Sequence, residues 1–319
     1  MHYQSILFGN GLNLLSLGNP SWDQLLRELE NYPWDKGTPN TIRYESYILT
    51  QPYRVPSAQL VASDDQSIMT ADKQLFFVLG EEVEFKLKQL IANEVSSFTT
   101  NPFYKVVSRL PVKHFITTNY ENLLLKEFGD ESKAEWHKQE RYYSISRYCR
   151  LDNEHYYWPI HGNINAPRSI MLGYDHYCGA LSKMNSFIKG IKESSKTNQV
   201  ESIVHRIKEG IGEPLSWIDL FFLTDIHIIG QGLDYAEVDL WWLLNKRRRY
   251  MHENEGLIDN KIVYYPDYFV NDDKRRLLNA FGVEINDIED YDYPNDNRSP
   301  SYAIQLDTIR KRMLTRLND

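Results

Sequence analysis

The chain has 319 residues, of which 42% are hydrophobic and 25% charged, and its formal net charge is −8 at pH 7. These fractions are typical of a globular protein and exclude an intrinsically disordered chain. The negative charge argues against general nucleic-acid binding, because the phosphate backbone selects basic surfaces. At about 150 residues per domain, the length fits two domains or one large domain with insertions.

The sequence shows neither a membrane span nor a metal-type cysteine pattern. No apolar run reaches the roughly 18 residues that a bilayer requires, and residues 1–30 lack the features of a signal peptide. Only two cysteines occur, Cys149 and Cys178, without the spacing of metal ligands. We therefore expect a cytoplasmic protein with no metal site and no membrane contact.

The chain begins with a predicted buried strand at residues 5–8. Ser21 and Gln24 form a capping-box pattern that predicts the start of a helix. Residues 32–70 show no clear period and are expected to be irregular, with a short helix at most. A long helix is predicted over 72–97, where apolar residues recur along one face.

Strands and helices alternate through the rest of the chain. Further strands are predicted at 113–117, 156–160, 225–229 and 261–265, with residues 170–172 as a candidate for another. Helices are predicted over 119–128, 179–223 with a polar break at 194–198, 235–249 and 301–317. An acidic loop is expected at 284–299. This alternation predicts an α/β fold, a Rossmann-like parallel sheet with helices on both faces.

We expect one domain over residues 1–319 that combines a sheet core with large helical insertions. The Rossmann-like core comprises about 1–31, 111–178 and 223–285. The insertions comprise about 32–110 and 179–222 and are expected to cover the ligand cleft, while the helix at 301–317 completes the fold.

Four of the predicted strands run directly into glycine-rich or polar motifs. Ligands of open α/β sheets bind at the carboxyl ends of the strands. The coincidence of unusual motifs with strand ends is therefore the strongest indication of a ligand site.

The first and last of these motifs are rich in glycine. Gly9-Asn10-Gly11-Leu12-Asn13 follows the first strand, and its glycines would let the backbone approach a diphosphate. The third glycine of the dinucleotide fingerprint is replaced by Leu14. Gly230-Gln231-Gly232-Leu233-Asp234 suits contact with the adenosine half of a dinucleotide, with Asp234 as a ribose ligand or a helix cap. Either motif can equally be a tight turn.

The two middle motifs carry the chemically active side chains. Thr117-Thr118-Asn119-Tyr120-Glu121 can hold sugar hydroxyls or a water, or can simply cap a helix. His161 ends an apolar strand and is followed by Gly162. A histidine in this place can act as a general base near neutral pH, or can be a satisfied histidine of the core.

Together and in this order, the four motifs resemble the sirtuin superfamily. Gly9 to Asn13, followed by Gly18-Asn19-Pro20, is similar to the family's Gly-Ala-Gly-x-Ser and Gly-Ile-Pro segments. Thr118-Asn119-Tyr120-Glu121 is similar to its Gln-Asn-Ile-Asp segment, His161-Gly162 to its His-Gly, and Gly230-Gln231-Gly232-Leu233 to its Gly-Thr-Ser loop. The resemblance spans residues 5 to about 245.

The chain departs from sirtuin deacylases at several positions. It lacks their two Cys-x-x-Cys zinc pairs, Asp23 stands near the place of their arginine, and Asn13 replaces their serine. The Thr-Thr-Asn-Tyr motif, the insertions and Gly173-Tyr174-Asp175 resemble bacterial sirtuin-like NAD+ hydrolases of anti-phage defence. The Gly-Asn-Gly opening is also similar to AbiH-like abortive-infection proteins.

The resemblance implies a reaction and a set of roles. NAD+ would be the substrate, cleaved between nicotinamide and ribose, with no metal. Asn119 and His161 would be the catalytic pair, Asn119 fixing the ribose hydroxyls and the water while His161 takes a proton, and Glu121 would orient them. Further contacts to NAD+ are expected from Gly9, Asn10, Gly11, Asn13, Thr118, Glu121, Gly230, Gln231, Gly232 and Asp234.

An unregulated NAD+ hydrolase would be toxic to its host, so the resemblance also implies a regulating second subunit, a homo-oligomer, or both. One alternative is a catalytically silent subunit that senses NAD+ or ADP-ribose for a partner. A second is an NAD-dependent protein deacylase, against which the missing zinc cysteines argue. A third is a nuclease-type abortive-infection protein, which the acidic charge and the lack of a metal motif disfavour.

Overall fold

The computed structural model describes residues 3–30, 37–50, 68–129, 134–137, 143–191, 200–210, 212–288 and 298–318. Its centre is one sheet in the strand order β3-β4-β5-β2-β1-β6-β7-β8. The strands are β1 Gln4–Phe8, β2 His114–Thr117, β3 Glu135–His137, β4 Tyr148–Arg150, β5 Tyr156–Pro159, β6 Asp225–Ile229, β7 Ile262–Tyr265 and β8 Val283–Ile285. The run from β5 to β8 is parallel, and β3 and β4 pair antiparallel at one edge.

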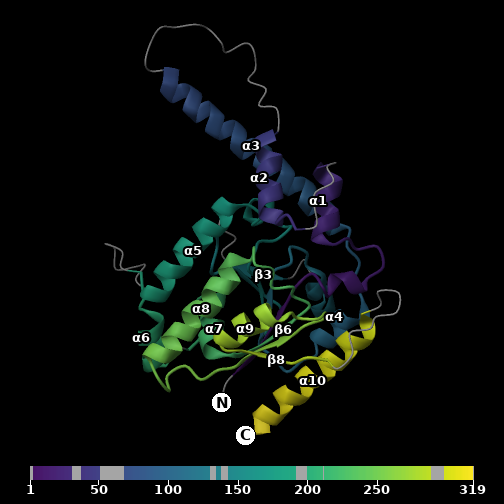
Figure 1. Cartoon of the computed structure of the whole chain (residues 1–319), viewed down its shortest axis with the longest axis vertical. Coiled ribbons are helices and arrows are strands. Elements are labelled where there is room, and N and C mark those ends of the chain that lie inside the picture. Colours follow the sequence, from purple (N-terminus) through teal and green to yellow (C-terminus); the bar gives the residue numbers. More distant parts are fainter. Residues whose placement is uncertain are drawn as a thin grey trace.

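Helices cover both faces of this sheet (Figure 1). They are α1 Trp22–Glu30, α2 Asn40–Thr50, α3 Ile68–Ser96, α4 Pro102–Val107, α5 Tyr174–Lys189, α6 Ile203–Glu209, α7 Trp217–Leu223, α8 Val238–Glu253, α9 Asp272–Ala280 and α10 Ser299–Asn318. Short 3₁₀ helices lie at Asn13–Leu15 (η1), Leu123–Phe128 (η3) and Pro167–Ser169 (η5). The predicted α/β fold with a Rossmann-like, mostly parallel sheet is therefore confirmed.

Successive side chains of a strand point to opposite faces of the sheet, so the core has two layers. In β1, Ile6 and Phe8 pack against the layer that includes the C-terminal half of α3, α4 and α10. Leu7 packs on the opposite face, against residues of α5, α7 and α8. Both faces of a parallel strand are buried in this arrangement, so apolar residues such as Ile6, Leu7 and Phe8 follow one another in β1 without alternating with exposed polar ones.

Three differences from the predicted elements concern short or irregular segments. Strands β3, β4 and β8 were not predicted, because three residues give too short a pattern to recognise. Residues 170–172 form no strand. In the stretch expected to be irregular, α2 is a helix of 11 residues.

Other differences concern helices. The helix predicted over 119–128 is present only as η3, because residues 118–122 turn into the interior first. The stretch 179–223 contains three separate helices, and α5 already begins at Tyr174. Part of the expected acidic loop, residues 289–297, lies outside the described residues. The predicted division into core and insertions stays a prediction.

The sheet order places a topological switch between β1 and β6. From β1 the chain continues to β2 and β5 on one side, and β6, β7 and β8 follow on the other. Crevices at such a point, outside the carboxyl ends of the strands, are where ligands bind in open α/β sheets. Within the described part of the chain, no helix is both long and apolar enough to cross a membrane.

Candidate active site

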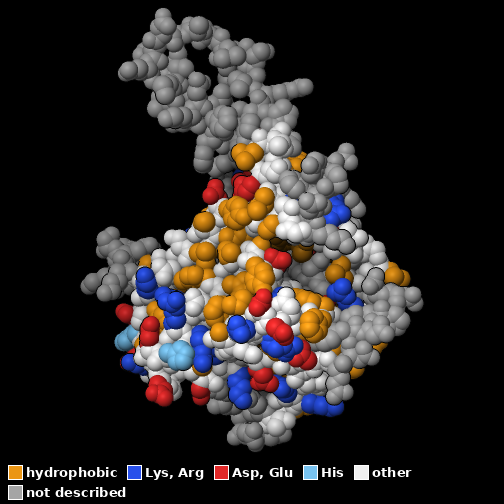
Figure 2. All heavy atoms as spheres, in the orientation of Figure 1, with side chains coloured by type: hydrophobic (Ala, Val, Ile, Leu, Met, Phe, Trp, Pro, Cys, Tyr) orange, Lys and Arg blue, Asp and Glu red, His pale blue; other side chains and the backbone are white. Residues whose placement is uncertain are grey.

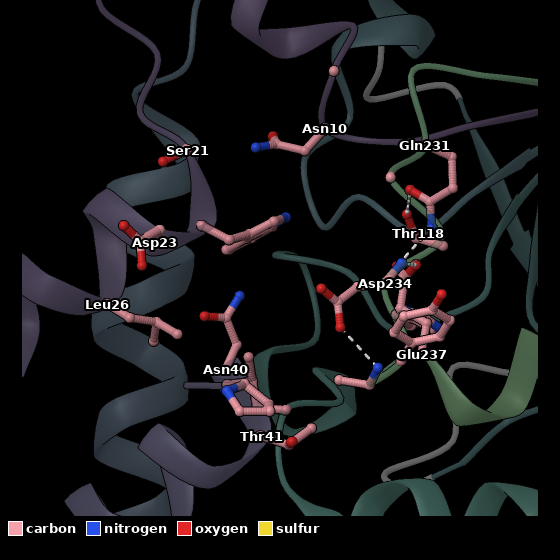
Figure 3. Close-up of a pocket in the computed structure, with 18 of the residues that line it drawn as sticks. Asn10, Ser21, Asp23, Leu26, Asn40, Thr41, Thr118, Gln231, Asp234 and Glu237 are labelled. Atoms are coloured by element: carbon pink, nitrogen blue, oxygen red, sulfur yellow. Dashed lines mark hydrogen bonds between the residues drawn. The ribbon is translucent and has the colours of Figure 1, made fainter. Parts of the chain in front are cut away.

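A cavity of about 770 Å³ lies at the carboxyl ends of the central strands (Figure 3). The loops after β1, β2, β5, β6 and β7 line it, together with the N-terminal ends of α1, α2 and α5. Figure 3 shows Ser21, Asp23 and Leu26 facing Thr118, Gln231 and Glu237 across the opening. Its size is that of a cofactor or substrate pocket.

Most of the residues predicted from the motifs meet at this cavity, although they come from four distant segments. The lining includes Asn10, Gly11, Thr118, His161, Gly230, Gln231, Gly232 and Asp234. Four predicted residues do not line it: Gly9, Asn13, Asn119 and Glu121. The carboxyl-end argument therefore located the site but could not tell which side chains of each motif face the opening.

The four remaining residues are buried and do not line the cavity. Asn119 is fully buried, and its amide nitrogen donates to Glu121 Oε1 at 3.0 Å. The Tyr104 hydroxyl lies 3.1 Å from the same oxygen and is also hydrogen-bonded to Asn13. Asn13 Nδ2 in turn donates to Asn10 Oδ1 at 3.0 Å. A buried hydrogen-bond chain thus runs from Asn119 to Asn10, which reaches the cavity.

Two features of these buried hydrogen-bonded residues bear on their chemistry. Burial raises the pKa of Glu121, although hydrogen bonds from its own backbone amide, Asn13, Tyr104 and Asn119 oppose that shift. The carboxamide oxygen of Asn119 has no hydrogen-bond partner among the described residues. Buried polar atoms are normally paired, so an unpaired oxygen one residue beyond Thr118 marks a place where a ligand or water can complete the structure.

The glycines of the first motif serve the packing of two loops. Gly11 donates its amide hydrogen to the Gly230 carbonyl at 2.8 Å, and Gly9 donates to the Ile229 carbonyl at 3.3 Å. A Cβ atom on Gly9 or Gly11 would stand 2.8 Å from the Gly230 oxygen. These two residues are therefore glycines because the loops after β1 and β6 touch. The tight-turn interpretation accounts for them without a diphosphate.

His161 stands at the end of β5 and forms a pair that the sequence did not reveal. Its Nε2 lies 2.8 Å from Oδ2 of Asp239, in the first turn of α8, and both side chains are almost fully buried. Gly162 follows with φ +109°, and a Cβ there would stand 2.4 Å from the Ser169 carbonyl oxygen. The ring of Tyr177 meets the imidazole edge-on, with centroids 5.7 Å apart.

The electrostatics of the pair are set by the start of α8. Burial by itself lowers the pKa of His161, but the charge and hydrogen bond of Asp239 and the charge of Glu237 outweigh burial and raise that pKa. Oδ1 of Asp239 has no hydrogen-bond partner among the described residues. The arrangement is that of a histidine base held by a carboxylate.

A second carboxylate lies beside this pair. Glu237 accepts hydrogen bonds from Gln231 Nε2 at 2.6 Å and from the Asp234 amide at 3.0 Å. Gln231 Oε1 accepts one from the Thr118 hydroxyl at 3.3 Å. Burial raises the pKa of Glu237 to about 7, with Asp239 and Asp234 adding to the shift and His161 and Gln231 opposing it.

Several residues of the site were not predicted, because no local pattern marks them. Glu237 lines the cavity, whereas Asp239 does not line it and contacts His161. Glu237 and Asp239 resemble ordinary acidic residues of a helix start, where they complement the helix dipole. Trp22, whose ring centroid lies 4.7 Å from that of Tyr120, lines the cavity on the side of α1. At the far end, Asp267 follows β7 and binds Arg298 at 3.1 Å.

Part of the rim is apolar. Tyr174, Tyr235 and Val238 line the opening and are exposed by 47%, 56% and 37%. Figure 2 shows hydrophobic side chains gathered on this face, over α5 and α8. The basic run 246–249 lies within α8, and its Arg247 is buried against Asn260.

Comparison with known families bears on this geometry. Residues 113–202 match the family model of a SIR2-like domain. The match supports a relationship to the sirtuin-like family. It is consistent with activity on NAD+, the molecule that SIR2-like domains bind. No curated protein matches the chain.

The matched stretch contains β2, β5, Asn119 and His161, whereas the motifs at 9–13 and 230–234 lie outside it. The tertiary structure joins these outer motifs to the matched stretch around one cavity. Among the described residues, no group of three or more His, Cys, Asp or Glu side chains could hold a metal ion.

Proposed function

We propose that this protein is an NAD+ hydrolase, which cleaves NAD+ to nicotinamide and ADP-ribose. The observation that carries the proposal is the pairing of His161, which lines the cavity and lies in the stretch that matches a SIR2-like domain, with the buried carboxylate of Asp239. A base of this kind suits the activation of a water molecule.

The charges around His161 suit this substrate. Asp239 and Glu237 place carboxylates near the imidazole. Glycosidic cleavage passes through an oxocarbenium-like state, which nearby negative charge stabilises. The nicotinamide ring of NAD+ is itself cationic. We therefore propose that NAD+ binds with its nicotinamide ribose toward His161 and its adenosine toward the loops after β6 and β7.

The proposed reaction needs one base and no acid. The bond between C1′ and the nicotinamide nitrogen breaks, and its electron pair neutralises the pyridinium, so nicotinamide leaves uncharged. Water forms the new bond to C1′, and His161 takes its proton. Asn119 is proposed to accept a hydrogen bond from a ribose hydroxyl or this water at its unpaired oxygen, once a ligand reaches between Thr118 and Tyr120.

The biological role proposed is that of a cytoplasmic effector of bacterial anti-phage abortive infection, which acts by depleting NAD+. Because unregulated NAD+ hydrolysis would exhaust the host, we propose control by a second subunit or by self-assembly. The alternative of a silent NAD+ or ADP-ribose sensor is favoured by one observation, the complete burial of Asn119.

The test is release of nicotinamide from NAD+ by the purified chain. We expect release by the wild type and by the control His205→Ala, whose histidine is exposed on α6. His161→Ala and Asn119→Ala should lose activity at least about 100-fold, as expected when a general base or its partner is removed. Full activity in His161→Ala would refute the mechanism. Calorimetric binding of NAD+ without turnover would favour the sensor, and absence of binding would reject both.

A further inference from the structure

Asp239 has the geometry of a residue that acts through His161. It is the second residue of α8 and is 1% exposed. One carboxylate oxygen, Oδ2, lies 2.8 Å from His161 Nε2, and the other has no partner among the described residues. Contacts between α5 and α8 bring Tyr177 against the imidazole. The Asp239 carboxylate therefore contacts the imidazole of His161 at Nε2.

This contact determines which ring nitrogen is available to a ligand. An ionised carboxylate only accepts hydrogen bonds, so a neutral His161 must carry its proton on Nε2. Its Nδ1 then holds the lone pair, and no hydrogen bond occupies Nδ1 within the described residues. Because His161 lines the cavity, Nδ1 is the nitrogen that remains for substrate or water.

We propose that Asp239 is a positioning residue, which holds His161 as the Nε2–H tautomer so that Nδ1 is the atom that takes the proton from the attacking water. The inference rests on the proposed NAD+ hydrolysis and deepens it. No covalent bond forms to Asp239. It keeps its own charge throughout, and the imidazolium that forms when Nδ1 gains the proton lies against that charge.

A purely structural role fits Asp239 poorly, as a comparison with Asp219 shows. Asp219 is equally buried, but its two oxygens bind Arg206 at 2.7 and 2.9 Å, and one also accepts from the Leu215 amide. That carboxylate is fully paired and lies away from the cavity. Asp239 instead has one oxygen without a partner among the described residues and a carboxylate neighbour, Glu237. Such crowding opposes folding and is typical of functional sites.

The charged groups that face His161 come from few elements. Asp239 and Glu237 approach from the start of α8, and Tyr177 and Tyr120 face the same cluster from α5 and from the turn after β2. Asp239 is the group in direct contact. Replacing it by asparagine therefore removes the main charge that favours imidazolium, and it allows the asparagine amide to bind the other tautomer.

The experiment compares the wild type, Asp239→Asn and the matched control Asp175→Asn. Asp175 is likewise the second residue of its helix, α5, but is exposed, so it controls for the loss of a first-turn charge. Nitrogen NMR of labelled histidine, with His161→Gln for assignment, reports the tautomer in each protein. Nicotinamide release between pH 5 and 9 reports kcat and KM.

We expect an Nε2–H signal for His161 in the wild type and the control, and its loss in Asp239→Asn. kcat of Asp239→Asn should fall by about 10²–10⁴-fold with KM nearly unchanged, as when the carboxylate of a histidine base is neutralised. The acid limb of its pH profile should move to lower pH, because the base has lost its stabilising charge.

Two results would overturn the proposal. One is an Nδ1–H tautomer in the wild type. The other is an Asp239→Asn protein with the tautomer, kcat and pH profile of the wild type. The NMR measurement needs no turnover, so it decides the role of Asp239 even if the wild type binds NAD+ without cleaving it. That last outcome would count against hydrolysis by the chain on its own and would leave the role of Asp239 standing.

Discussion

Glu237 offers a test of the site's electrostatics that does not depend on any activity. The side chain is half-buried between Gln231 and the Asp234 amide, and burial is the largest cause of its raised pKa. Replacement by glutamine keeps the shape and removes the charge. We expect Glu237→Gln to stabilise the folded chain above neutral pH and to leave its stability unchanged in acid.

The magnitude follows from the difference in pKa between the folded and unfolded chain. The pKa rises from 4.5 to about 7 on folding, which corresponds to about 3 kcal/mol at about 1.36 kcal/mol per pKa unit. Below pH 4.5 the carboxyl is protonated in both states, so nothing is lost. Between pH 4.5 and 7 the unfolded chain ionises while the folded chain resists, and stability falls. Because Glu237 is only partly buried, solvent screening makes about 3 kcal/mol an upper value.

Urea denaturation at pH 5 and pH 8 measures this difference, with the exposed Glu255→Gln as control. At pH 8, Glu237→Gln should exceed the wild type in free energy of unfolding by up to about 3 kcal/mol, and at pH 5 by less than about 1 kcal/mol. A gain of the same size at both pH values would refute the reasoning, and so would a loss at pH 8. The first result would mean that the gain does not come from removing the charge, and the second that the carboxylate is stabilised by its neighbours in the fold.

Two further predictions concern the scaffold. Gly162→Ala should cost about 1–3 kcal/mol of stability, because its φ is +109° and a Cβ would stand 2.4 Å from a backbone carbonyl oxygen; thermal unfolding should show Gly212→Ala, in open space, to be tolerated. Asp219→Asn should cost about 3–5 kcal/mol in chemical denaturation, because it leaves the Arg206 guanidinium unpaired in a buried place. The exposed Asp307→Asn should change stability by less than about 1 kcal/mol.

The sheet could be predicted because its signals are local. Each central strand is a short segment rich in apolar residues, and both faces of a parallel strand are buried, so the segment itself marks the strand. Segments where the local pattern is weak were predicted less well. The strands β3, β4 and β8 have three residues each, and η3 replaces an expected helix because its first residues turn inward.

The motifs lie at strand ends, as predicted. A motif by itself, however, does not show which of its side chains face the cavity. Thr118 and Tyr120 line the opening, whereas Asn119 between them is buried against Glu121. At a turn the direction of each side chain depends on its neighbours in space. The glycines at positions 9 and 11 likewise serve the contact with the loop after β6.

The sequence by itself determined the α/β fold, the edge of the sheet where the cavity lies, and the place of His161 at that edge. Only the tertiary structure decided the partner of His161. Asp239 lies 78 positions further along the chain and resembles any acidic residue at a helix start. His161 follows β5 and Asp239 follows β6, which lies three strands away in the sheet, and the first turn of α8 brings the Asp239 carboxylate to the imidazole. No local pattern encodes a proximity that arises from the order of strands.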